Sequence, residues 1–228
     1  MMPEELITVQ KMVIQDSIKQ GNTVILTYKI EYPRFCSDYF SCEIEKVNHY
    51  YYMNAMQTKR NYTTVLCKGA MDDLYFARKN NFPFHTHEAM VTYTVTYNAG
   101  CIVSLFFDSY MYLGGAHGDT VRSSQTWNMQ KGEKISLAEL FDCNDDMKDY
   151  IIMHVRKEVS QNPEEYFSTA WVAIGQEFNP LYFYCTPEGV IIYFQQYAIA
   201  PYCAGIREFL LPYGECFMNP LEKCNPLY

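Results

Sequence analysis

The first part of the chain alternates between apolar and polar side chains, which is typical of β-strands. Residues 23–32 place Val, Leu, Tyr or Ile at every second position, and residues 6–14 are rich in β-branched side chains. Gly21-Asn22 between the two segments is a turn signal. We therefore expect a hairpin of residues 6–14 and 23–32, with one face on the core, that ends at Pro33.

The pattern changes to helical spacing in residues 37–79, which contain no Pro and a single Gly. This segment predicts one long helix, or a pair of helices broken near residues 59–64, where Asn and Thr are weak helix formers. Ser37 or Asp38 is the expected N-cap, and Asn-Asn-Phe-Pro at 80–83 is the expected end.

Strand patterns return in the rest of the chain. Residues 89–97, 101–112 and 120–129 predict an antiparallel meander, and residues 181–185, 189–195 and 208–211 predict three shorter strands. Helices are expected at 136–141, at 147–161 with Asn144 or Asp145 as cap, and from Pro163. The predicted fold class is α+β, with antiparallel sheets packed against a long N-terminal helix and shorter C-terminal helices.

Composition places the chain among folded proteins and narrows its partners. Of 228 residues, 49% are hydrophobic and 19% are charged, and no apolar run is long enough for a membrane helix. The net charge of -8 argues against nucleic acid as a partner. Residues 115–228 carry 8 basic and 15 acidic side chains, so most of the acidity lies in the second half. That asymmetry suits a basic partner, although solubility alone also explains it.

Cysteine usage suggests a reducing compartment. The nine cysteines include no C-x-x-C pair and show no regular spacing. Most stand among apolar neighbours, where a thiol acts as a small core residue. We expect them to be mostly reduced and, since the start of the chain lacks the pattern of a signal peptide, we expect a cytoplasmic protein. They are Cys36, Cys42, Cys67, Cys101, Cys143, Cys185, Cys203, Cys216 and Cys224.

Two segments carry candidate chemistry. Gly114-Gly115-Ala116-His117-Gly118 flanks one histidine with glycines between two predicted strands, so His117 is either a base or ligand at a rim, or part of a structural bulge. The segment 197–205, Tyr-Ala-Ile-Ala-Pro-Tyr-Cys-Ala-Gly, follows a predicted strand as a loop held by Pro201 and Gly205. Its Tyr197 and Tyr202 either form an adhesive surface or pack inward.

Together with Trp127-Asn128-Met129-Gln130-Lys131-Gly132, Ile135-Ser136-Leu137-Ala138-Glu139-Leu140-Phe141 and Phe183-Tyr184, these two segments resemble the RsiV-type domain of bacteria over residues 86–213. That family supplies the lysozyme-sensing ectodomain of an anti-sigma factor and an accessory region beside peptidoglycan deacetylase domains. Residues 1–85, a hairpin and long helix, resemble more loosely the companion domain of unknown function that usually precedes it. We expect these two parts to pack as one unit, followed by a tail at 214–228.

The resemblance implies a non-catalytic binding module, since catalysis in the family lies in a separate deacetylase domain. The expected partner is a basic protein such as a lysozyme, or a cell-wall fragment, bound by a monomer or weak dimer, and family members are usually extracytoplasmic. We expect neither cofactor nor metal. The predicted binding residues are Gly114, Gly115, His117, Gly118, Tyr197, Pro201, Tyr202 and Gly205.

Weaker signals leave alternatives open. A small hydrolase with His117 as general base is the second hypothesis, and a cytosolic protein that keeps the fold with a changed ligand is the third. His85 and His87 could form a metal pair on one strand face, but without a third ligand nearby we interpret them as surface histidines. Asp142, Asp145, Asp146 and Asp149 lack the calcium-loop pattern, and a helix start explains them.

Overall fold

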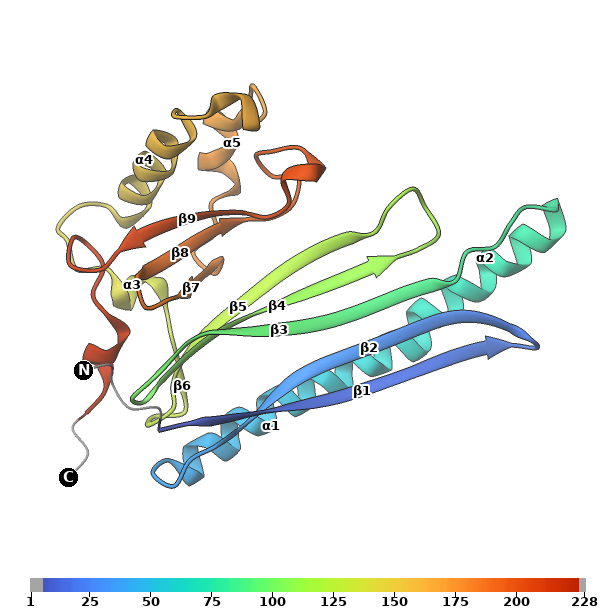
Figure 1. Ribbon diagram of the computed structural model, residues 1–228, viewed down its shortest axis with the longest axis horizontal. Coiled ribbons are helices and arrows are strands. Elements are labelled where there is room, and N and C mark those ends of the chain that lie inside the picture. Colours follow the sequence, from blue (N-terminus) through green and yellow to red (C-terminus); the bar gives the residue numbers. More distant parts are fainter. Residues whose placement is uncertain (1–5, 226–228) are drawn as a thin grey trace.

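The computed structural model describes residues 6–225, and its strands form two β-sheets (Figure 1). The larger sheet has six strands that follow one another in sequence order. They are β1 (Thr8–Gln20), β2 (Thr23–Cys36), β3 (His87–Ala99), β4 (Ile102–Tyr112), β5 (Asp119–Asn128) and β6 (Glu133–Ile135). The smaller sheet is made of β7 (Phe183–Cys185), β8 (Gly189–Phe194) and β9 (Arg207–Pro212).

The larger sheet is the middle layer of the molecule. One side, called here the helix side, is covered by α1 (Ser41–Asn61) and α2 (Cys67–Asn80), and the other, the small-sheet side, packs on β7–β9 near β4 and β5 (Figure 1). Adjacent residues show this arrangement: Phe107 stacks on Tyr51 of α1, whereas Phe106 contacts Tyr184 of β7. The class is therefore α+β, as predicted.

The first hairpin is longer than expected. Gly21 turns the chain with a φ of 63°, but β2 runs past Pro33, which pairs with Lys11, as far as Cys36. β2 pairs with β3 only from Leu26 to Ile30. Beyond Ile30 one edge of β2 has no ladder partner, so the missing N–H of Pro33 removes no ladder hydrogen bond and the strand continues.

The long helical segment is interrupted where weak helix formers predicted a break. Between α1 and α2 the chain forms one π-helical turn, Tyr62–Leu66, and the Thr63 and Thr64 hydroxyls donate to backbone carbonyls one turn earlier. The predicted cap was wrong, because α1 begins at Ser41 without a side-chain cap rather than at Ser37 or Asp38. The predicted end is confirmed, with Asn81 in the left-handed conformation after Asn80.

The meander β3–β4–β5 is confirmed as antiparallel. One pair departs from the prediction of antiparallel sheets: β2 and β3 are parallel, since the helices between them carry the chain back to the same end of the sheet. The larger sheet therefore runs across residue 85, where the sequence suggested a boundary between two parts that pack together. The division into those parts stays a prediction.

The second half holds the small sheet and several short helices, and the helices between residues 147 and 177 lie on the side of the small sheet that faces away from the larger sheet (Figure 1). The three predicted strands are confirmed as β7–β9. Helices α3 (Leu137–Leu140) and α4 (Met147–Val159) lie where they were expected, although Asp146 caps α4 instead of Asn144 or Asp145. Helix α5 (Ala170–Glu177) was not predicted. Short 3₁₀ helices occupy Pro163–Glu165, Tyr202–Ala204 and Pro220–Lys223.

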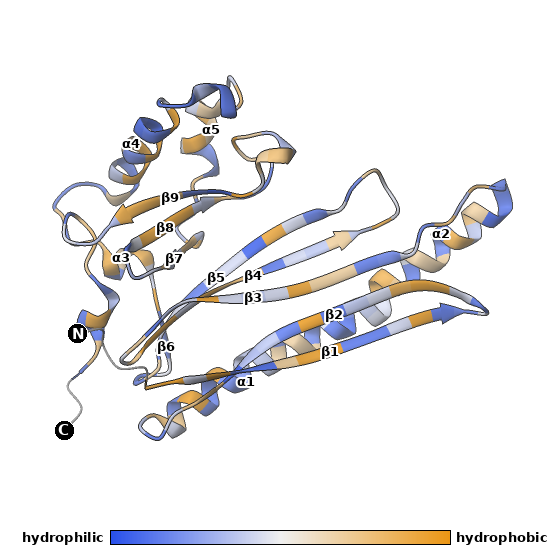
Figure 2. Ribbon diagram, viewed as in Figure 1, coloured by the Kyte–Doolittle hydropathy of each residue, from blue (hydrophilic) through white to orange (hydrophobic). Residues whose placement is uncertain are grey.

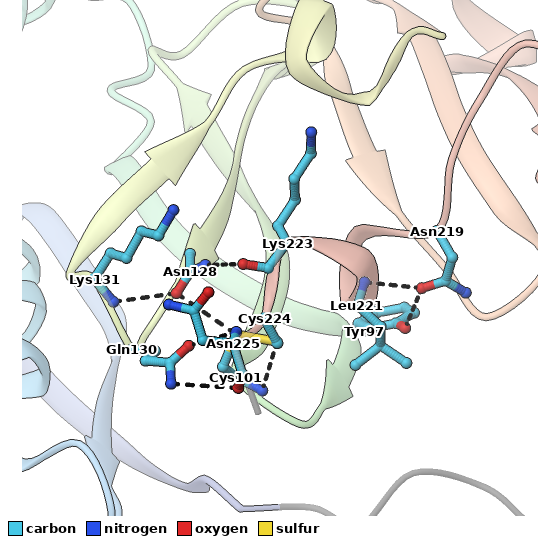
Figure 3. Close-up of a disulfide and its surroundings, with 10 residues drawn as sticks. All are labelled: Tyr97, Cys101, Asn128, Gln130, Lys131, Asn219, Leu221, Lys223, Cys224 and Asn225. Carbon is cyan, nitrogen blue, oxygen red and sulfur yellow. Dashed lines mark hydrogen bonds between the residues drawn. A yellow bond between two sulfur atoms is a disulfide. The ribbon is translucent and has the colours of Figure 1, made fainter. Parts of the chain in front are cut away.

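Two disulfides attach the C-terminal segment to the rest of the fold. Cys101 pairs with Cys224, and Cys143 pairs with Cys216. The expectation of reduced cysteines was wrong for these four, since partners 123 and 73 residues apart leave no local signal in the sequence. Figure 3 shows that hydrogen bonds from Asn128 to Lys223 and between Gln130 and Asn225 also hold this segment. The five free cysteines are Cys36, Cys42, Cys67, Cys185 and Cys203.

Figure 2 marks the apolar positions along the ribbon, and the buried ones form two clusters between the layers. One cluster joins the start of α1, the β4 end of the sheet and the small sheet, and a second lies between β2 and α2. Between residues 6 and 225, no helix is long and apolar enough to cross a membrane.

Candidate functional site

The glycine-rich segment is the hairpin loop between β4 and β5. Gly114 turns the chain with a φ of 85°, and Gly115 and His117 are exposed. Gly118 is buried against Tyr110, and a Cβ on Gly118 would lie 2.4 Å from the Tyr110 ring. The backbone at 118 thus approaches this ring closely, and a side chain there would require the end of the Tyr110 side chain to move.

The second segment leaves β8 and is fixed to β5 by two glutamines. Gln195 accepts a hydrogen bond from the Arg122 N–H at 2.9 Å and donates to the Arg122 carbonyl at 2.7 Å. The Gln196 side chain accepts from the Thr120 N–H at 3.3 Å. β6 pairs only with residues 126–128 of β5, so these amides satisfy backbone groups on the part of the β5 edge that β6 leaves free.

The two loops meet through aromatic rings. The His117 ring lies on the Tyr202 ring, with 4.2 Å between their centroids, and the Tyr202 hydroxyl donates to the Gly118 carbonyl at 2.8 Å. Tyr197 also contacts Tyr202, at 5.5 Å between the ring centroids. Pro201 precedes the short helix that carries Tyr202, and Gly205 ends it with a φ of 66°. The structure thus brings both sequence-predicted segments into one surface, called here the His117–Tyr202 surface.

Tyr197 has an unusual backbone. Its φ is 67°, in the left-handed region that a bulky residue rarely adopts, and its side chain is 49% exposed. Such a conformation costs about 1–3 kcal/mol and persists only where the surroundings hold it. At this position the loop therefore presents a large aromatic ring to solvent, which suits contact with a partner.

A charge network that the sequence reasoning missed lies beside this surface. Arg122 is buried on the small-sheet side of β5, donates to both oxygens of Asp108 at 2.7 and 2.8 Å, and also donates to Glu208 of β9. Its guanidinium lies 3.7 Å from the centre of the Phe106 ring. Burial alone lowers the pKa of Arg122, but the hydrogen bonds and charges of Asp108 and Glu208 raise it overall.

The network leaves the neighbourhood acidic. Asp108 and Glu208 are two carboxylates against the one guanidinium of Arg122. The exposed Asp119, near His117, adds a further carboxylate to the adjoining loop. A sequence signal existed, since Arg122 is the only Lys or Arg in residues 80–130 and stands in a strongly patterned strand. Which side of the sheet it faces, and which β9 residue it meets, required the tertiary structure.

The polar surroundings of His117 are sparse. Its Nδ1 lies 3.2 Å from the Gly118 carbonyl and 3.8 Å from Asp119, and within residues 6–225 these are its polar contacts. Neither contact supplies a hydroxyl or thiol nucleophile, so the geometry gives no support to the hydrolase alternative.

The other histidine pair is separated by the fold. His85 is exposed, but His87 is 3% exposed, faces α2 and lies 3.1 Å from Asp73. The prediction of surface histidines is therefore right for His85 and wrong for His87, because His87 is the first residue of β3 and lies under α2, whereas His85 precedes the strand. In the described part of the chain, no group of three or more His, Cys, Asp or Glu side chains could hold a metal ion.

Comparison with known proteins gives two matches along the chain. Residues 19–120 match the family model described as deacetylase PdaC, and residues 138–214 match a protein family of unknown function, DUF3298. The chain resembles PdaC in its first half and DUF3298 in its second. The PdaC-like segment ends with the β4–β5 hairpin loop, and the DUF3298-like segment contains the Tyr202 loop, so the His117–Tyr202 surface is formed where the two segments meet.

Solved structures share the fold over nearly the whole chain. A DUF3298 family member from Bacteroides fragilis is 14% identical, with a TM-score of 0.72 over 96% of this chain and 97% of that one. A DUF3298 family protein from Pseudomonas aeruginosa is 16% identical, with a TM-score of 0.58 over 91% of this chain and 90% of that one. No curated protein matches the chain. At these identities the likeness concerns the fold, and the RsiV-type resemblance stays a prediction.

Proposed function

We propose that this protein is a non-catalytic binding module that holds a basic protein, such as a lysozyme, on the His117–Tyr202 surface. The observation that carries the proposal is the contact between the His117 and Tyr202 rings, which joins two loops from different segments into one aromatic surface. Aromatic side chains bury a large area at low entropic cost and are enriched among residues that dominate binding energy.

Charge supports the choice of a basic partner. Asp119 is exposed beside His117, Glu208 is partly exposed beside Arg122, and the second half of the chain carries a net charge of -7 from 8 basic and 15 acidic residues. Such a field accelerates the encounter with a positively charged protein, and cationic side chains also bind the faces of Tyr rings.

The disulfides bear on where such binding would take place. Two disulfides among nine cysteines favour an oxidising compartment over the cytoplasm expected from the sequence. An extracytoplasmic location would also expose the protein to lysozyme-like enzymes. Cell fractionation of the native source, followed by detection of the protein in the envelope or the cytosol, tests this part of the proposal.

The test is isothermal titration of the oxidised protein with a c-type lysozyme at two salt concentrations. We expect saturable binding that weakens with added salt, and Tyr202→Ala should weaken it by about tenfold or more, as for a central aromatic contact. Tyr75→Ala is the matched control, because Tyr75 is 69% exposed on α2, on the other side of the sheet. If no heat of binding were measured at both salt concentrations, the proposal would be contradicted. An equal loss of affinity in Tyr202→Ala and Tyr75→Ala would contradict it as well.

A cell-wall fragment is the other partner class that the resemblance implies. Titration with a soluble peptidoglycan fragment under the same conditions distinguishes the two. If the fragment binds, lysozyme does not, and Tyr202→Ala abolishes binding of the fragment, then the His117–Tyr202 surface is the binding site and its partner is a cell-wall fragment.

A further inference from the structure

A cavity of about 320 Å³ lies on the helix side of the larger sheet, away from the His117–Tyr202 surface. One wall is α1, which contributes Tyr50, Asn54 and Thr58, and the floor is formed by β2–β5. α1 packs mainly on β2, so the outer parts of β4 and β5 stay partly uncovered on this side, and Ser123 of β5 is exposed.

The strands create the cavity by a change of side-chain size. Leu105, Phe107 and Ser109 of β4 alternate toward the helix side, and Ser123 lies directly opposite Phe107 on β5. Leu105 is buried in the core, Phe107 stacks on Tyr51 at 5.5 Å between centroids, and the serines that follow are too small to reach α1. A space lined by rings at one end and hydroxyl groups at the other results.

The hydrogen-bonding groups of the cavity are partly committed and partly free. The Trp127 indole N–H donates to the Tyr51 hydroxyl at 2.6 Å, and Tyr51 donates to the Gln125 side-chain oxygen at 3.1 Å. These two hydrogen bonds hold Gln125 by its side-chain oxygen and leave its two amide N–H donors free. Within residues 6–225, five further polar lining side chains have no hydrogen-bond partner: Tyr32, Asn54, Thr58, Ser109 and Ser123.

The cavity offers little net charge to a ligand. Its one charged lining residue is Glu31, whose oxygens bind Lys11 at 2.8 Å and Lys29 at 2.7 Å. The hydrogen bonds from Lys11 and Lys29 lower the pKa of Glu31, so its charge is already compensated at neutral pH. The remaining polar groups are amides and hydroxyls, which are neutral donors and acceptors.

We propose that this cavity binds a neutral, polyhydroxylated ring, namely a sugar of one or two residues. The volume lies at the lower end of the range of ligand sites, about 300–1,000 Å³, which fits a small ring and excludes a folded peptide. The half-buried Tyr32, Tyr50 and Phe107 offer apolar ring surfaces, while the amides and serines offer alternating donors and acceptors for hydroxyl groups. This site goes beyond the proposed protein-binding surface, which lies on the opposite side of the sheet.

Ligand-observed saturation-transfer NMR with glucose, cellobiose and cyclohexanol at millimolar concentration tests the proposal on the oxidised protein. We expect transfer to the two sugars and not to cyclohexanol, which has a ring of similar size with a single hydroxyl group. Ser123→Phe, which places a ring opposite Phe107, should abolish the transfer. Asn54→Ala should weaken sugar binding by about three- to tenfold through loss of hydrogen bonds.

Gln57→Ala is the matched control, because Gln57 is exposed on α1 but does not line the cavity. Asn54→Ala replaces an exposed helical residue by the best helix former, so its effect on binding does not depend on loss of fold. Absence of transfer to either sugar, stronger transfer to cyclohexanol, or transfer unchanged by both Ser123→Phe and Asn54→Ala would each overturn the proposal. Lysozyme titration of Ser123→Phe should match the wild type, which separates this result from a failure of the protein-binding proposal.

Discussion

Removal of the Cys101–Cys224 disulfide by Cys224→Ser should destabilise the protein substantially. The bond closes a loop of 123 residues, so the chain-entropy relation gives a loss of about 16 cal/mol/K, or about 5 kcal/mol at 25 °C. Observed values are smaller than this model predicts, typically about 2–4 kcal/mol. We therefore expect a decrease of about 3–4 kcal/mol in the free energy of unfolding.

The effect should arise mainly in the unfolded chain. In the native state other contacts still hold the C-terminal segment, because the Lys223 carbonyl accepts from Asn128 at 2.9 Å and the Asn225 N–H donates to Gln130 at 2.8 Å (Figure 3). The near-ultraviolet circular dichroism of the variant should thus match the wild type. The unfolded variant is less constrained and exposes more surface, so the denaturant slope should rise.

Urea unfolding without reductant measures this change. With a slope of about 2–3 kcal/mol/M, the midpoint of Cys224→Ser should fall by about 1–2 M. Cys42→Ser is the matched control, because Cys42 is an exposed free thiol on α1 and its loss should leave the midpoint unchanged. A midpoint for Cys224→Ser equal to that of the wild type would refute the reasoning, since it would mean that the bond does not constrain the unfolded chain.

Two further substitutions test other parts of the structure. Gly118→Ala should lower the melting temperature by an amount that corresponds to about 1–3 kcal/mol, because the new Cβ would lie 2.4 Å from the Tyr110 ring. Gly115→Ala is the control, because its Cβ meets nothing within 4 Å and the change should be near neutral. Equal shifts of the melting temperature in the two variants would contradict this account. Glu31→Gln should reduce stability at neutral pH. The lysine hydrogen bonds lower the folded pKa of Glu31 below its usual 4.5, so the stabilisation is present above pH 4.5 and is lost as pH falls through the folded pKa. In urea titrations the gap between wild type and Glu31→Gln should shrink on acidification, and a constant gap would argue against the ion pairs as its cause.

Much of the backbone could be predicted from the sequence because the signals are local. Alternation in residues 23–32 and 89–97 locates strands of the larger sheet, and the weak helix formers near Thr63 coincide with the π-helical turn. The wrong predictions of element ends also rested on local signals. Pro33 indicated a strand end because the sequence does not show that one edge of β2 is unpaired there, and Asp146 rather than its neighbours caps α4.

The candidate site was predictable only in part. The glycines around His117 and the Tyr and Pro residues near 201 are unusual in composition, so both loops could be selected from the sequence. Their meeting could not, because the His117–Tyr202 contact spans 85 positions and depends on how the small sheet lies on β4 and β5. The Arg122 network was missed for the same reason, since its partner Glu208 lies 86 residues away.

The sequence by itself determined the class of the fold, the order of most strands and helices, and the two loops that stand out chemically. Periodicity and turn residues act over a few positions, so their outcome is written in the local pattern. The tertiary structure alone decided the parallel pairing of β2 and β3, which cysteines pair in the two disulfides, and the cavity beside Asn54 and Ser123. Each of these depends on distances between residues far apart in the chain, which only the packing of the layers fixes.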